Sequence, residues 1–243
     1  MTFWQNLFWI SFPYIMLTMF VVGHIYRYNT DQFGWSAKSS EFLEKKQLKW
    51  GSILFHYGII FVFFGHVAGI LIPKAFYDAV GITDHMYHFG AVWIGGLAGL
   101  ATIIGVCLLM VRRFTAKRIY VHSTFRDILV LILLALIIFS GFVNTVWYTG
   151  RGVAFEYRDT ISPWFRGILT LRPQPNLMFG IPLGFQIHVV SALLLFGIWP
   201  FTRLVHVWSL PLEYVKRKFI VYRAIFGRRA LAMSTDRSKK GAE

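Results

Sequence analysis

The sequence is poor in cysteine and in charged residues. Cys107 is the one cysteine among 243 residues, which excludes an intrachain disulfide and a metal cluster held by four cysteines. Charged side chains make up 15% of the chain, whereas a soluble domain carries about 25%. The chain also lacks an internal repeat, a feature common in secondary transporters. The low charge therefore indicates a protein that is not an ordinary soluble domain.

Apolar residues are abundant instead. Hydrophobic residues form 56% of the chain and aromatic residues 18%. Apolar runs of about 20 residues recur, which is the length that crosses a bilayer as a helix. The predicted spans are residues 3–26, 51–72, 87–111, 128–147 and 183–207. We therefore expect an all-α, polytopic membrane helical bundle with five transmembrane helices.

The basic residues are unevenly distributed. The formal net charge is +14, and most Lys and Arg lie in the loops after spans 1 and 3 and in the tail after span 5. Because positive residues stay on the cytoplasmic side, we expect the N-terminus outside and the C-terminus in the cytoplasm, with no nucleic-acid partner. The expected organisation is a membrane domain over 1–212 and a basic cytoplasmic tail over 213–243. The first residues, Met1 to Trp4, have no basic region, so we expect no cleavable signal peptide.

Spans 2 and 5 each contain two histidines: His56 and His66, then His188 and His206. Ionisable residues inside a membrane are expensive and usually functional. The two spans run in opposite directions, so His66 and His188 share the outer level and His56 and His206 share the inner level. Each level thus holds one histidine from either span.

Paired imidazoles suit iron, copper and zinc. No Cys, Asp or Glu accompanies them, which argues against a zinc or copper cluster, and nearby glycines such as Gly65 and Gly69 suit a large planar ligand. We therefore predict two b-type haems, held without thioether bonds, an outer one by His66 and His188 and an inner one by His56 and His206. Ligation by two histidines fills both axial positions and favours electron transfer.

The spacing along the two spans is unequal. On straight helices His56 and His66 would lie about 15 Å apart, and His188 and His206 about 27 Å apart. Pro200 lies between the last two and is expected to bend span 5.

Other polar residues are candidates for the surroundings of these groups. Arg203 and Arg112, near the inner end, are predicted partners of haem propionates. His85 and His88 lie at the outer mouth of span 3, where a histidine is able to accept a proton that a quinol releases on oxidation.

Several stretches carry a family resemblance: Leu54-Phe55-His56 through Gly65-His66, then Pro200 to Ser209, and Pro211-Leu212-Glu213-Tyr214. With these motifs the chain resembles the gamma subunit of respiratory nitrate reductase, a membrane di-haem cytochrome b. The resemblance implies the same four histidine ligands. It implies oxidation of menaquinol or ubiquinol at the outer haem, and electron transfer to an iron–sulfur beta subunit and a molybdenum alpha subunit that reduces nitrate. It also implies a bacterial or archaeal cytoplasmic membrane.

The chain departs from the family at the quinol site. The best-known members carry a lysine in the stretch that corresponds to Thr83–His88, where this sequence has none, so His85 or His88 is expected to replace it. Two alternatives remain open: a related cytochrome b subunit of a heterodisulfide- or sulfite-type reductase, and a haem-free membrane scaffold or transporter.

Overall fold

The computed structural model describes residues 3–31, 34–35, 44–150 and 155–209. These residues contain helices and no strand. The chain divides into two compact units, Met1–Trp208 and Ser209–Glu243, and the account below concerns the first. The predicted basic tail over 213–243 lies outside the described residues.

Five helical segments of the described chain are long and apolar enough to cross a membrane, which confirms the predicted all-α, five-span architecture. Three of them change to a π-helical turn along their length. The segments are α1 (Phe3–Asn6) with a π-helix (Leu7–Ser11) and α2 (Phe12–Thr30), α3 (Lys46–His66) with η3 (Val67–Leu71), α5 (Asp84–Thr115), α7 (Phe125–Val143) with η4 (Asn144–Thr149), and α9 (Leu183–Ile198) with η6 (Trp199–Phe201).

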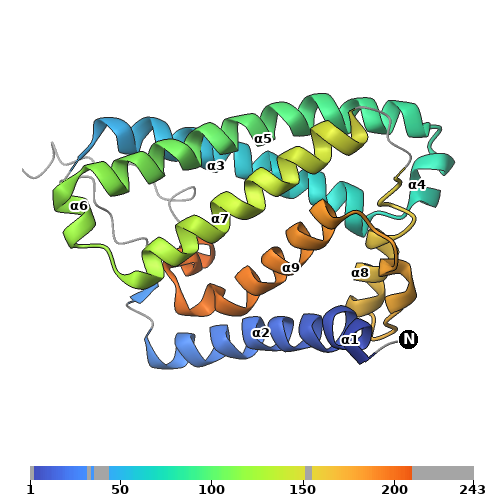
Figure 1. Cartoon of the computed structure of the whole chain (residues 1–243), viewed down its shortest axis with the longest axis horizontal. Coiled ribbons are helices and arrows are strands. Elements are labelled where there is room, and N and C mark those ends of the chain that lie inside the picture. Colours follow the sequence, from blue (N-terminus) through green and yellow to red (C-terminus); the bar gives the residue numbers. More distant parts are fainter. Residues whose placement is uncertain (1–2, 32–33, 36–43, 151–154, 210–243) are drawn as a thin grey trace, which may run out of the picture. The chain divides into compact units, whose positions relative to one another are not determined.

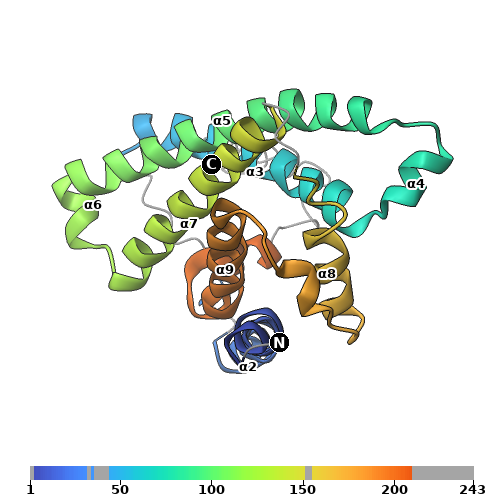
Figure 2. The same cartoon turned by 45° about the vertical axis from the view of Figure 1, so that its right-hand side comes forward.

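Shorter helices join these segments: α4 (Lys74–Ala79), α6 (Lys117–Val121) and α8 (Ile161–Leu169), with 3₁₀ turns η5 (Pro175–Met178) and η7 (Arg203–Ser209). Within the first unit, α3 packs along α5, α5 on α7, α7 on α9, and α9 on α2. The helices α4 and α8 lie at the same end as the N-terminus, and α6 lies at the opposite end (Figures 1 and 2). We call these the α4–α8 end and the α6 end.

Glycine permits the closest helix contact in the bundle, between α3 and α5. A Cβ added at Gly58 would lie 2.8 Å from the backbone nitrogen of Thr102, and one at Gly105 would lie 2.7 Å from Cα of Phe55. Side chains would hold the two backbones apart at these points, and small residues are the usual solution inside a membrane. The α3–α5 pair is therefore a firm support for the histidines that α3 carries.

The fifth segment ends earlier than the predicted span 183–207. Helix α9 stops at Ile198, a 3₁₀ turn follows, and the spanning segment ends at Phe201. Pro200 has no amide hydrogen and cannot continue the α-helical hydrogen bonds. Thr202 is extended, and a second 3₁₀ turn, η7, then carries His206. Pro200 thus breaks the helix, where the sequence predicted a bend within a longer one.

The long predicted loop 148–182 contains the short helix α8. Its buried side chains join a cluster with the N-terminal segment and α9, in which Trp164 is only 1% exposed. The indole nitrogen of Trp164 donates to the carbonyl of Trp9. Helix α8 is thus packed into the α4–α8 end.

Candidate functional site

The structure brings the four predicted histidines together in the predicted pairs. The ring centroids of His66 and His188 lie 5.9 Å apart with an interplanar angle of 22°. Those of His56 and His206 lie 6.0 Å apart at 73°. The first pair lies toward the α4–α8 end, where α3 ends and α9 begins, and the second toward the α6 end. The first pair joins α3 to α9, and the second joins α3 to η7.

These separations fit one metal ion between each pair of rings. Metal–imidazole bonds are about 2 Å long and a ring centre lies about 1 Å from its nitrogen, so two imidazoles on opposite sides of one metal have centroids about 6 Å apart. Aromatic rings in direct contact have centroids about 4.5–7 Å apart. Both observed distances are therefore compatible with bis-imidazole ligation and with direct ring contact.

Hydrogen bonds fix which ring nitrogen is available. In all four residues Nδ1 lies near a backbone carbonyl: Ser52 for His56 at 2.8 Å, Val62 for His66 at 2.8 Å, Ile137 for His188 at 3.0 Å and Arg203 for His206 at 2.6 Å. A carbonyl accepts, so Nδ1 carries the hydrogen and Nε2 keeps its lone pair. Metal-ligating histidines are usually oriented in this way.

A fifth histidine, His24, differs from the four paired histidines in the partner of its Nε2. His24 also binds a backbone carbonyl through Nδ1, that of Phe20 at 2.6 Å. Its Nε2, however, accepts from the indole of Trp208 at 3.1 Å. The lone pair of His24 is thus used within the protein.

The break at Pro200 accounts for the unequal spacing. His56 and His66 are ten residues apart on α3, and His188 is ten residues from Ile198, where α9 ends, so each helical stretch covers about 15 Å. Beyond Ile198 the chain turns, and His206 does not continue deeper along the helix axis. The mismatch expected on straight helices is thereby removed.

The space beside these rings also suits a large ligand. A Cβ added at Gly65, next to His66, would meet no atom within 4 Å. Helix α3 is absent from the closely packed neighbours of α9, while His56 and His66 are exposed. No group of three or more His, Cys, Asp or Glu side chains forms a metal cluster in the described part of the chain, and axial ligation of haem requires two ligands per iron.

The two arginines predicted at the propionates have protein partners. The Nε of Arg112 donates to Oε2 of Glu44 at 2.7 Å, and its guanidinium is buried. Arg203 pairs with both carboxylate oxygens of Asp127, at 2.7 and 2.6 Å. A contact of either arginine with a propionate stays a prediction.

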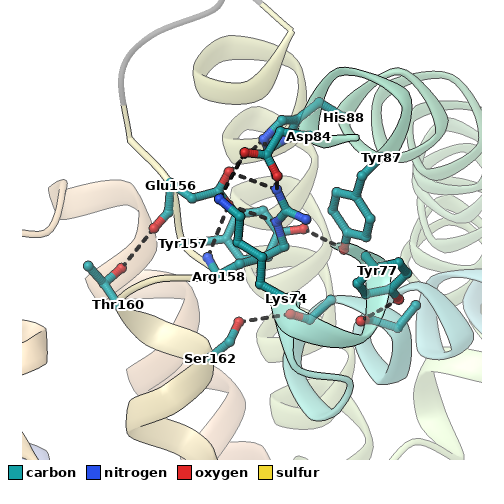
Figure 3. A network of polar contacts seen from close by, with 12 residues as sticks. Lys74, Tyr77, Asp84, Tyr87, His88, Glu156, Tyr157, Arg158, Thr160 and Ser162 are labelled. Atoms are coloured by element: carbon teal, nitrogen blue, oxygen red, sulfur yellow. Dashed lines mark hydrogen bonds and ion pairs between the residues drawn. The ribbon is translucent and has the colours of Figure 1, made fainter. Parts of the chain in front are cut away.

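The α4–α8 end contains a network of polar side chains (Figure 3). Arg158, 3% exposed, lies at its centre and forms two hydrogen bonds with Glu156 and one with Asp84. Its guanidinium also stacks over the ring of Tyr87 at 4.0 Å. His88 reaches Glu156, with Nε2 2.6 Å from Oε2.

The charges in this network are held by mutual contacts. Burial raises the pKa of Glu156, but hydrogen bonds from Arg158 and His88 outweigh it and hold that pKa below its usual range. Burial opposes the charge of Arg158, yet its carboxylate partners raise the pKa of the guanidinium overall. Nη1 of Arg158 and Nδ1 of His88 are buried without a hydrogen-bond partner among the described residues. Within the described residues, the network thus retains two hydrogen-bonding atoms without a partner.

A pair of tyrosines links the network to the region of His66. The hydroxyls of Tyr87 and Tyr157 are 3.0 Å apart, and a Cβ added at Gly69 would lie 2.7 Å from the first and 3.0 Å from the second. Gly69 follows His66 by three residues. Burial raises the pKa of Tyr157, so its hydroxyl remains protonated.

The two quinol-site candidates differ in their surroundings. His88 is a member of the network, whereas His85 is exposed and makes no recorded polar contact within the described residues. Glu156, Arg158 and Tyr157 were not predicted from the sequence. Their partners lie about 70 positions away, and no local pattern indicates such contacts.

Comparisons with known proteins identify the family of this chain. The family model described as nitrate reductase gamma subunit matches residues 5–225. The nitrate reductase gamma chain of Bacillus subtilis is 51% identical over 215 residues, covering 88% of this chain and 96% of that protein. The respiratory nitrate reductase 2 gamma chain of Escherichia coli is 34% identical, covering 89% and 96%.

A nitrate reductase-like protein NarX of Mycobacterium tuberculosis is 41% identical over 220 residues, which are 90% of this chain but 34% of that longer protein. The match to the family model, over residues 5–225, includes all four paired histidines. The chain belongs to the nitrate reductase gamma subunit family.

Proposed function

We propose that this protein is the quinol-oxidising, di-haem cytochrome b subunit of a respiratory nitrate reductase. Its family and its five spans make it a multi-pass membrane subunit of an oxidoreductase complex. The observation that carries the finer proposal is the pairing of four histidines from antiparallel segments, with ring centroids 5.9 and 6.0 Å apart.

His66 and His188 would hold one b-type haem toward the α4–α8 end, and His56 and His206 a second toward the α6 end. Haem iron with two axial histidines supplies one-electron transfer and leaves no coordination site for substrate. The carbonyls that bind each Nδ1 keep the rings in place and make Nε2 a stronger ligand. The chain thus provides two fixed sites at different depths.

The network at the α4–α8 end is the proposed quinol site. Oxidation of a quinol releases two protons together with two electrons, so the site needs a group that accepts a proton near neutral pH. His88 is placed for this role because Glu156 binds its Nε2 at 2.6 Å and its Nδ1 is buried with no partner among the described residues. A quinol hydroxyl at Nδ1 would complete these contacts, and the neighbouring Tyr157 remains a neutral donor.

The α4–α8 end would face the outside, and the α6 end the cytoplasm. The basic loop around α6 supports this orientation. The iron–sulfur and molybdenum subunits of the proposed complex would then contact the α6 end. Family membership favours a nitrate reductase over the heterodisulfide- and sulfite-type complexes, and it disfavours a scaffold or transporter.

Optical spectra test the haem proposal. The complex, purified from cells with sufficient haem supply, should show b-type bands after dithionite reduction and about two haems per chain. Replacement of His66 or His188 by Ala should remove one haem, and replacement of His56 or His206 the other. His122→Ala, at an exposed histidine outside both pairs, should retain both. A wild-type complex without b-type bands would refute the proposal.

The quinol site has a separate test. His88→Gln should slow quinol oxidation and change its pH profile while both haems remain, because the proton acceptor is lost but the ligands are not. His85→Gln serves as the matched control and should behave as the wild type. Equal effects of the two substitutions would show that His88 has no special role.

A further inference from the structure

The segment that carries His206 is not part of a regular helix. Helix α9 ends at Ile198, and His206 lies eight positions later in the 3₁₀ turn η7. His188, by contrast, lies within α9 itself. The direction of the His206 ring therefore depends on the backbone break between Ile198 and Arg203, whereas that of His188 follows from helix geometry.

A broken helix inside a membrane protein exposes carbonyl groups that need donors. Arg27, in the last turns of α2, supplies them. Its Nη1 donates to the carbonyl of Pro200 at 2.6 Å and to that of Thr202 at 2.7 Å. Its Nη2 donates to the carbonyl of Gly34 at 2.9 Å. One guanidinium thus binds the backbone on both sides of Phe201.

Helix α2, which carries Arg27, packs directly against Pro200 at the break. One turn before Arg27 lies Gly23, where an added Cβ would lie only 2.8 Å from Cγ of Pro200. Residues four positions apart share a helix face. The same face of α2 therefore contacts the proline ring with its glycine and the flanking carbonyls with its arginine.

Contacts on the other side of the break extend this support to His206. Arg203 is paired with Asp127 at the start of α7, and its carbonyl accepts from Nδ1 of His206 at 2.6 Å. Val205 is completely buried. Between Thr202 and His206 the chain thus has little freedom once the break is fixed.

We propose that Arg27 is a positioning residue for the inner haem: by binding the carbonyls of Pro200 and Thr202, it sets the break that brings His206 opposite His56. A lysine has a single ammonium and cannot reproduce the planar donor fork. The inference rests on the proposed ligation by four histidines. It predicts that the two haem sites respond differently to one substitution far from both in sequence.

The experiment compares Arg27→Ala and Arg27→Lys in the full complex. The measurements are the haem-to-protein ratio and the redox titration of the b-type bands. His206→Ala and His188→Ala assign the two redox waves. We expect Arg27→Ala to lose the wave that is missing in His206→Ala, so that the ratio falls from two to one, and to keep the other. Arg27→Lys should retain both haems with only the inner wave displaced.

Arg126→Ala is the matched control, because Arg126 approaches the same break through a single contact of 3.5 Å with the carbonyl of Phe201. It should keep both waves unchanged. If Arg27→Ala does not accumulate, Arg27→Lys decides: displacement of the inner wave alone supports the role, and any other pattern refutes it. Two unchanged waves in Arg27→Ala would overturn the inference while leaving the proposed function intact. A wild type without haem would instead fail the proposed function.

Discussion

Substitution of Gly105 by alanine should disturb the closest contact between α3 and α5. The new Cβ would clash with the backbone nitrogen of Phe55 and would lie 2.7 Å from its Cα, where 3.4 Å is ordinary contact. Helix backbones in a packed bundle do not yield locally, so relief of the clash requires α3 to move by about 1 Å. Overpacking of this kind costs about 1–3 kcal/mol. A loss of 2 kcal/mol changes the ratio of folded to unfolded protein about 30-fold.

The displacement reaches a proposed ligand, because Phe55 directly precedes His56. The assay is the fraction of solubilised complex that keeps its native elution volume after stepwise heating, read together with the redox titration. Gly105→Ala should lose native protein at a lower temperature than the wild type. It should also shift the redox wave assigned to the proposed haem of His56 and His206.

Gly96→Ala is the matched control on the same helix. An added Cβ at Gly96 would meet no atom within 4 Å, and alanine is a better helix former than glycine. This variant should be as stable as the wild type or slightly more stable. Equal behaviour of Gly105→Ala and Gly96→Ala would refute the idea that glycine is required for the α3–α5 contact.

Three further predictions follow from the ion pairs and the orientation. Burial raises the pKa of Glu156, but its hydrogen-bond partners lower that pKa more, so the folded-state pKa lies below the usual carboxyl value. The ionised carboxylate therefore stabilises the fold above the usual carboxyl pKa, and this stabilisation is lost as pH falls through the lowered folded-state pKa. In thermal melts between neutral pH and about pH 3, Glu156→Gln should therefore melt at a lower temperature than the wild type at neutral pH. Its melting temperature should also fall less than that of the wild type as the pH is lowered. Asp127→Asn should cost about 1–3 kcal/mol, because Asp127 forms an ion pair and the α7 capping box, measured by the same melts. With Cys107 replaced by Ser, a cysteine at His122 should react with an impermeant thiol reagent only from the cytoplasmic side, and one at Asp159 only from outside; the reverse result would invert the proposed orientation.

Much of the bundle could be predicted because membrane spans are local features of a sequence. Length and hydropathy are sufficient to predict a spanning helix such as Asp84–Thr115. The alternating direction of the spans is sufficient to predict that His66 lies near His188. The predicted end of the fifth span, residue 207, was wrong, because the apolar sequence continues past Pro200 while the spanning helix ends at Phe201.

The surroundings of the site were harder to predict. Arg27 binds carbonyls 173 and 175 positions away, and Glu156 binds a histidine 68 positions away. Such contacts depend on how the helices pack, which no residue pattern in either segment specifies. The ion pair of Arg203 with Asp127, 76 positions away, was likewise not predicted.

The π-helical turn that follows His66 connects this proposed ligand to α4 and α8. The carbonyls of Ala68, Gly69 and Ile70 accept hydrogen bonds from the side chains of Tyr77, Ser162 and Arg166, respectively. Connecting loops usually tolerate insertions well. Here an insertion ahead of α8 would displace Ser162 and Arg166 and pull on the peptide groups of Gly69 and Ile70, three and four positions after His66, so even small changes ahead of α8 should register in the spectrum of the proposed haem.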